Sequence, residues 1–64
     1  MIIGYQKGNN VYYQWGSRSN ILVASNARFV SVSGNYIVYE KNGRTYKAEV
    51  NQNGYIVRNN ILVA

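Results

Sequence analysis

The sequence contains no cysteine, no histidine, no aspartate and no proline. Without cysteine the chain can form neither a disulfide nor a thiolate metal site. Because histidine and aspartate, the commonest nitrogen and oxygen ligands, are also missing, we expect no metal and no cofactor. A chain of 64 residues buries only about 60% of its unfolded surface and usually needs a disulfide, a metal or a partner subunit. By elimination, we expect a homo-oligomer.

Carboxyl groups are scarce as well, since Glu40 and Glu49 are the only acidic residues. The usual acid–base and nucleophilic sets need histidine, cysteine or aspartate. In the strand register predicted below, the two glutamates lie about 13 Å or more apart, whereas a glycosidase pair needs roughly 5 to 9.5 Å. We therefore expect no enzyme and no catalytic residues, with a metal-free ribonuclease built from arginine, lysine and tyrosine as the one exception left open. Each glutamate lies diagonal to Lys47, which predicts weak cross-strand ion pairs.

Long apolar segments are absent too. The longest uncharged apolar runs are four residues, at 21–24 and 61–64, far short of the roughly 18 residues that a membrane span needs. No basic region followed by an apolar stretch opens the chain, so we expect no signal peptide. These features predict a cytoplasmic or intracellular location and no membrane span.

Tyrosine, valine and isoleucine dominate the ordered stretches, and asparagine and glycine interrupt them about every 6 to 10 residues, as in a strand meander. We predict one domain, 1–64. Strands are expected at 2–7, 10–15, 20–24, 27–33, 35–41, 44–50, 54–58 and 60–64. The expected fold is all-β, an antiparallel meander of short strands forming a small barrel or curled sheet. A propeller-like assembly from several chains is the alternative.

The clearest unit of this meander surrounds Asn42-Gly43, the strongest short hairpin signal that a sequence offers. A two-residue turn there pairs Lys41 with Arg44, and a turn at Gly34-Asn35 pairs Arg28 with Lys41. The further predicted pairs are Tyr39 with Tyr46, Ile37 with Ala48, Val32 with Ile37 and Val30 with Tyr39. Because side chains alternate along a strand, one face becomes an apolar core. Its members are Val30, Val32, Ile37, Tyr39, Tyr46, Ala48 and Val50, while Phe29 lies on the wetter face.

A seven-residue segment occurs twice. Residues 18–24 and 58–64 share six of seven identities and lie 40 positions apart. Periods near 40 occur in four-stranded propeller blades, although stacked repeats usually need three copies. Either the two segments occupy related places in a pseudo-symmetric barrel, or the similarity arises by chance in a chain of low residue variety.

Positive charge dominates, with seven lysines and arginines and a formal net charge of +5. A basic surface favours nucleic acid or another polyanion, although solubility alone is a simpler explanation. In the predicted register Arg28, Lys41 and Arg44 gather at one end of the sheet, beside Tyr39 and Tyr46. Like charges directly opposite each other are destabilising, so a bound anion would offset that cost. The plainer alternative is that cations beside turns protect strand edges from aggregation.

Aromatic side chains form a second candidate feature, since Trp15 lies close to Arg18 in a dense aromatic stretch. An exposed ring beside a cation can stack on a base or on a sugar. The main hypothesis is a non-enzymatic binding module with a basic, tyrosine-rich surface for nucleic acid or another polyanion. Its predicted binding residues are Arg28, Lys41, Arg44, Tyr39, Tyr46, Arg18 and Trp15. A self-assembling structural or interaction protein and a glycan-binding module are the alternatives.

Overall fold

The structure, a computed structural model, describes residues 1–64 and consists of seven strands joined by turns. They are β1 (Ile2–Lys7), β2 (Asn10–Trp15), β3 (Arg18–Ser25), β4 (Arg28–Ser33), β5 (Tyr36–Lys41), β6 (Arg44–Val50) and β7 (Ile56–Leu62). Every paired neighbour runs antiparallel, which confirms the all-β antiparallel meander. The structure contains no helix that is long and apolar enough to cross a membrane.

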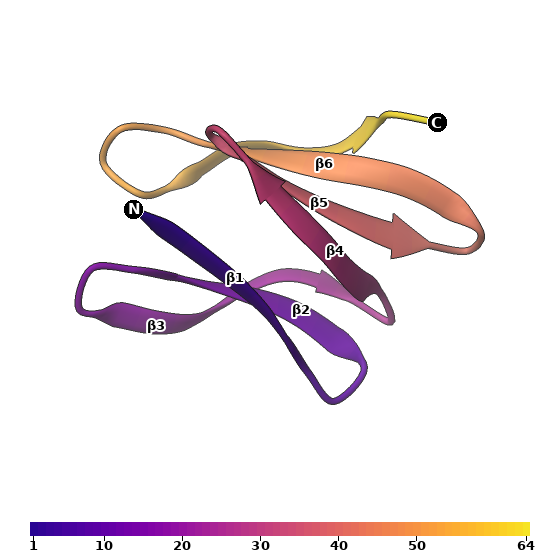
Figure 1. The fold of residues 1–64 in the computed structure, drawn as a ribbon, viewed down its shortest axis with the longest axis horizontal. Helices are drawn as coiled ribbons and strands as arrows, with labels where there is room; N and C mark the ends of the chain where they lie inside the picture. Colours follow the sequence, from indigo (N-terminus) through magenta and orange to yellow (C-terminus); the bar gives the residue numbers. More distant parts are fainter.

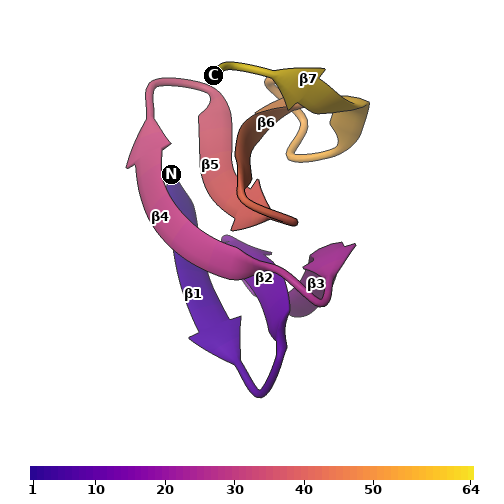
Figure 2. The same ribbon diagram turned by 90° about the vertical axis from the view of Figure 1, so that its right-hand side faces the viewer.

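The strands form two sheets, β1-β2-β3 and β4-β5-β6-β7, which pack against each other (Figure 1). The expected small barrel or single curled sheet is wrong, because neither sheet closes or curls strongly. The cause lies at Asn26, whose left-handed φ of 51° turns the chain out of the first sheet. As a result β4 does not pair with β3, but lies against β1 and β2 and pairs with β5 (Figure 2).

The predicted strands near 54–58 and 60–64 are one strand, β7, so the chain has seven strands where eight were expected. The asparagines at 59 and 60 suggested a turn, but the ladder between β6 and β7 continues across them with a shift of register. Asn60 absorbs this shift with a φ of 55°. The structure therefore uses an asparagine as a β-bulge where the sequence suggested a turn.

The core lies between the two sheets and contains no polar or charged residue that is fully buried. Its members are Val11, Tyr13, Val23, Ala24, Ala27, Ile37, Tyr39, Ala48 and Val50. β2, β5 and β6 supply residues at alternate positions, as expected for half-buried sheets packed face to face, whereas β3 supplies the adjacent Val23 and Ala24 at a bulge. Gly4 allows the close approach of β4, because a Cβ there would overlap the ring of Phe29.

The predicted register is confirmed for the hairpin that turns at Asn42-Gly43, with the pairs Lys41–Arg44, Tyr39–Tyr46 and Ile37–Ala48. It is only partly right for the preceding hairpin. Val32 pairs with Ile37 as predicted, but Val30 forms a bulge, so Phe29 pairs with Tyr39 and Arg28 pairs with Glu40. Val30 is consequently exposed and Phe29 packs on the core, the reverse of the prediction.

The repeated segment at residues 18–24 and 58–64 occupies related places in the two sheets. The first copy lies within β3, the second runs from β7 to the last residue, Ala64, and each contains a bulge in the same position. Asn20 and Asn60 both have a φ of 55°. Both copies of the repeat therefore contain a left-handed asparagine that forms a bulge and bends the strand. The two copies do occupy related places, but these lie in two sheets and not in one barrel.

Candidate anion-binding site

Three chain segments meet at one end of the molecule. They are the turn after β1 (Gly8-Asn9), the linker between β3 and β4 (Asn26-Ala27) and the turn after β5 (Asn42-Gly43). Each segment contains left-handed backbone, with φ of 61° at Gly8, 51° at Asn26 and 53° at Asn42. Glycine and asparagine adopt this conformation most readily. Their places in the sequence therefore determine where these turns form.

Gln6 fixes the first turn to the linker. Its Nε2 donates to the carbonyl oxygens of Gly8 and Ala27, each at 3.0 Å. Its Oε1 accepts a hydrogen bond of 2.7 Å from the Phe29 amide. The Ala27 amide also donates to the Asn9 carbonyl at 2.9 Å. These contacts hold the β1–β2 turn and the start of β4 as one unit.

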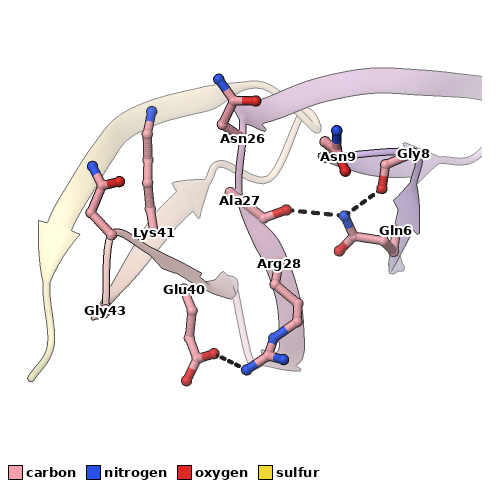
Figure 3. A pocket seen from close by; sticks show the side chains of 10 residues that line it. Gln6, Gly8, Asn9, Asn26, Ala27, Arg28, Glu40, Lys41 and Gly43 are labelled. Carbon is pink, nitrogen blue, oxygen red and sulfur yellow. Dashed lines mark hydrogen bonds and ion pairs between the residues drawn. The ribbon is translucent and has the colours of Figure 1, made fainter.

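A polar hollow of about 760 Å³ lies among the three segments (Figure 3). It is lined by Gln6, Gly8, Asn9, Asn26, Ala27, Arg28, Glu40, Lys41, Asn42 and Gly43. Ala27 is the single hydrophobic residue among them. Amide side chains, turn backbone and two cations can donate hydrogen bonds here, so the lining suits a polar or anionic ligand and not an apolar one.

Positive charge exceeds negative charge at this end. Lys7, Arg28, Lys41 and Arg44 flank the three segments, and Glu40 is the one carboxylate among them. Glu40 accepts a hydrogen bond of 2.5 Å from Arg28 Nη2, and both side chains are largely open to solvent. An exposed pair of this kind contributes little stability. No ion pair involves Lys41, Arg44 or Lys7.

The structure keeps Lys41 opposite Arg44 but changes the environment of Arg28. Lys41 and Arg44 face each other across the β5–β6 turn, as the sequence predicted. The expected pairing of Arg28 with Lys41 is wrong, because the bulge at Val30 moves Arg28 one position along and brings it to Glu40. In Figure 3 the side chains of Arg28 and Lys41 extend in different directions from the lining of the same hollow.

Of the two tyrosines predicted beside the cations, Tyr39 lies in the core and Tyr46 packs against it. Tyr39 is fully buried, and its hydroxyl lies 2.7 Å from the Oδ1 atoms of Asn59 and Asn60, to either of which it can donate. Burial raises the pKa of Tyr39 above its ordinary value, because the phenolate would lose its hydration. Tyr46 is half-buried and stacks on Tyr39 with ring centroids 5.9 Å apart. Tyr39 therefore offers no surface on which a base could stack.

Trp15 and Arg18 lie at the far end of β2 from these turns, about 16 Å along the strand. Trp15 packs directly on Gly54. The Nη2 of Arg18 donates to the carbonyls of Asn53 at 3.0 Å and Gly54 at 3.1 Å, and its guanidinium lies 4.3 Å from the centre of the Tyr55 ring. Both residues thus hold the 51–55 loop and are not brought together with Arg28, Lys41 and Arg44.

The two glutamates pair with arginines, so the predicted contacts with Lys47 are wrong. Glu49 accepts a hydrogen bond of 2.7 Å from Arg58 Nε, and this bond raises the pKa of the Arg58 guanidinium. Lys47 instead places its ammonium 4.2 Å from the centre of the Tyr36 ring. Nowhere do three acidic, histidine or cysteine side chains come together as metal ligands would.

Sequence reasoning missed the role of the amide side chains in the lining. The asparagines at 9, 26 and 42 were recognised as turn residues, and their position in turns was the signal that could have identified them as donors at the site. Gln6 had no such signal, because its partners Ala27 and Phe29 are more than twenty residues away. Comparison of the chain with protein-family models, with curated proteins and with solved structures gave no match.

Proposed function

We propose that this chain is a non-enzymatic binding module for a polyanion, with the sugar–phosphate backbone of nucleic acid as the best candidate. The observation that supports this most directly is the polar hollow among the three turns, which is lined by Arg28, Lys41 and one carboxylate, Glu40, with Arg44 facing Lys41 across the turn. Phosphate contacts in proteins come mainly from arginine, lysine, amide side chains and backbone amides, and all four kinds of donor occur here.

Lys41 and Arg44 are the two cations that most directly favour a bound anion. They face each other across a tight turn and have no ion-pair partner, an arrangement that costs stability until an anion lies between them. Arg28 adds a third cation, which can exchange its exposed contact with Glu40 for a phosphate. The tyrosines play no direct part in this proposal, since Tyr39 is buried and Tyr46 is half-buried.

The test is a titration of a labelled single-stranded oligonucleotide at several salt concentrations. Three phosphate contacts, from Arg28, Lys41 and Arg44, predict a slope of about −2 in log affinity against log salt. Affinity should therefore fall roughly 20-fold between 50 and 200 mM salt. An affinity that stays flat over this range would exclude polyanion binding.

A matched pair of variants then locates the contact. Lys41→Gln removes a cation from the hollow, and Lys47→Gln removes the same charge from the opposite face of β6, where the lysine lies over Tyr36. We expect Lys41→Gln to reduce the salt slope by about 0.7 and Lys47→Gln to leave it unchanged. Equal effects of the two variants would mean that net charge alone, and not this site, attracts the ligand.

A further inference from the structure

The chain contains the same three-stranded unit twice, as β1-β2-β3 and as β5-β6-β7. In each unit a tyrosine pair faces across the first two strands, Tyr5 with Tyr12 and Tyr39 with Tyr46, and the rings stack at 6.0 and 5.9 Å. In each unit a left-handed asparagine on the third strand lies beside the hydroxyl of the first tyrosine. The identical residues at equivalent ladder positions are Ile3/Ile37, Tyr5/Tyr39, Lys7/Lys41, Tyr12/Tyr46, Arg18/Arg58 and 20–24/60–64.

The two units use opposite faces to form the core. We call the face that carries the tyrosine pair the tyrosine face, and the other the back face. The second unit buries its tyrosine face, since Ile37, Tyr39 and Ala48 are each 0% exposed. The first unit buries its back face, through Val11 and Tyr13. The units therefore pack head to tail, with the tyrosine face of one on the back face of the other.

Head-to-tail packing leaves one face of each kind open. The tyrosine face of the first unit points away from the core, with Ile3 49% exposed although its equivalent Ile37 is fully buried. The back face of the second unit is also outside the core, with Thr45 and Lys47 at the positions that Val11 and Tyr13 occupy in the first unit. The two open faces are thus the same two kinds of surface that already pack together inside the chain.

We propose that the open tyrosine face of one chain docks on the open back face of a second copy of the chain, repeating the head-to-tail packing between its own two sheets. An interface between two different surfaces generates a closed ring or an open stack, depending on its rotation. The ring is the propeller-like assembly that the sequence left as an alternative.

The open faces are more polar than their counterparts in the core, so the association is reversible. Gln14 takes the place of Ala48, and Lys47 takes the place of Tyr13. One hydrogen bond between the two sheets can also be repeated between copies. Within the chain, Asn59 Nδ2 of the second unit donates to the Val23 carbonyl of the first at 2.8 Å. The residue equivalent to Asn59 is Ser19, the residue equivalent to Val23 is Val63, and both are exposed. The formal charge of +5 opposes contact between copies, so added salt strengthens docking.

Ile3 and Leu22 provide a matched test, because both are 49% exposed and both lie on the open tyrosine face. Their equivalents differ: Ile37 is fully buried by the packing inside the chain, while Leu62 remains 57% exposed. Docking should therefore bury Ile3 and leave Leu22 at the rim. In sedimentation velocity over a wide concentration range, we expect Ile3→Glu to weaken self-association about tenfold or more and Leu22→Glu to change it little. Circular dichroism and melting temperature check that both variants fold.

Mixing two variants tests the head-to-tail geometry. Ile3→Glu blocks the open tyrosine face, and Thr45→Arg blocks the open back face, where Thr45 takes the place of the buried Val11. At a concentration where the wild type is associated, each variant alone should be mainly monomeric, because its docking is weakened about tenfold or more. A mixture of the two should form dimers and nothing larger, because only one intact pair of faces remains.

Several results would overturn the proposal. They are a wild-type chain that stays monomeric at every concentration and salt level, equal loss in Ile3→Glu and Leu22→Glu, and mixed variants that do not associate. If Ile3→Glu does not fold, Ile3→Thr replaces it and must give the same pattern. The salt dependence separates this proposal from polyanion binding, since salt should strengthen docking between copies and weaken the binding of an oligonucleotide.

Discussion

Gly54 offers the sharpest test of how the two sheets are held together. Its φ is 84°, and a Cβ there would overlap the Trp15 ring and the Arg18 guanidinium. Its carbonyl accepts hydrogen bonds from the Tyr13 hydroxyl at 2.7 Å and from Arg18 Nη2 at 3.1 Å. The loop therefore needs a residue without a side chain at this point, and Gly54→Ala is the perturbation of choice.

The expected cost has two parts. A left-handed conformation costs a non-glycine residue about 1–2 kcal/mol, and overpacking against a ring adds about 1–3 kcal/mol. The lower conformational entropy of the unfolded alanine chain returns roughly 0.4–1 kcal/mol. The net loss in free energy of unfolding is centred at about 3 kcal/mol, within a range of about 1–4.6 kcal/mol, which is a large share of the roughly 3–10 kcal/mol expected for 64 residues.

Gly34→Ala is the matched control, because Gly34 has a φ of 58° and nothing within 4 Å of the added Cβ. It carries only the conformational cost, about 1 kcal/mol. In thermal unfolding we expect Gly54→Ala to lower the melting temperature by roughly 10–25 °C and Gly34→Ala by roughly 4–8 °C. Trp15 fluorescence reports the same transition from the ring that the new methyl group meets. Equal losses in the two variants would refute the close packing of Trp15 and Arg18 on Gly54.

Two further predictions concern tyrosine hydroxyls. Tyr39→Phe should lower the free energy of unfolding by about 1–2 kcal/mol in urea titrations, because it removes the buried hydroxyl that contacts Asn59 and Asn60. Tyr5→Phe should cost about 0.5 kcal/mol, because the Tyr5 hydroxyl bonds Asn20 at a more exposed site. A larger loss for Tyr5→Phe than for Tyr39→Phe would contradict this order. Burial also raises the pKa of Tyr13 and Tyr39 above the ordinary value near 10. Since the folded state favours the neutral phenol, this contribution to stability is complete below pH 10 and is lost as pH rises through the raised pKa, at about 1.4 kcal/mol per pH unit for each tyrosine. Unfolding measured from pH 8 to 11 should show a shallower alkaline decline in Tyr13→Phe than in the wild type, and an unchanged decline would count against burial as the cause.

Local features of the chain were readable from its sequence. Six of the eight predicted strands match single strands of the structure closely, and the Asn42-Gly43 turn was placed with the correct pairs Lys41–Arg44 and Tyr39–Tyr46. Alternation of apolar residues identified most of the core face, including Ile37, Tyr39 and Ala48. These features depend on neighbours along the chain or across one tight turn, so they follow from backbone preferences and a period of two.

The errors in strand register and strand number arose where asparagine or an exposed valine bends a strand. Asn60 was assigned to a turn and forms a bulge, and the bulge at Val30 moves Arg28 from Lys41 to Glu40. A single extra residue shifts every later pair along a strand, and asparagine tolerates left-handed backbone in turns and in bulges alike. The sequence therefore identifies asparagines that adopt left-handed backbone, but not whether each of them forms a turn or a bulge.

What the sequence determined by itself was the strands, the tight turns, the excess of positive charge and the repeat of residues 18–24 at 58–64. What only the tertiary structure decided was the division into two sheets, the hollow among three separate turns and the buried face of the first repeated unit. In that unit both faces carry apolar side chains, Ile3 and Tyr12 on one and Val11 and Tyr13 on the other, so alternation alone does not choose between them. That choice depends on contacts between residues distant in sequence, such as Gly4 with Phe29 and Tyr13 with Gly54, which no local preference specifies.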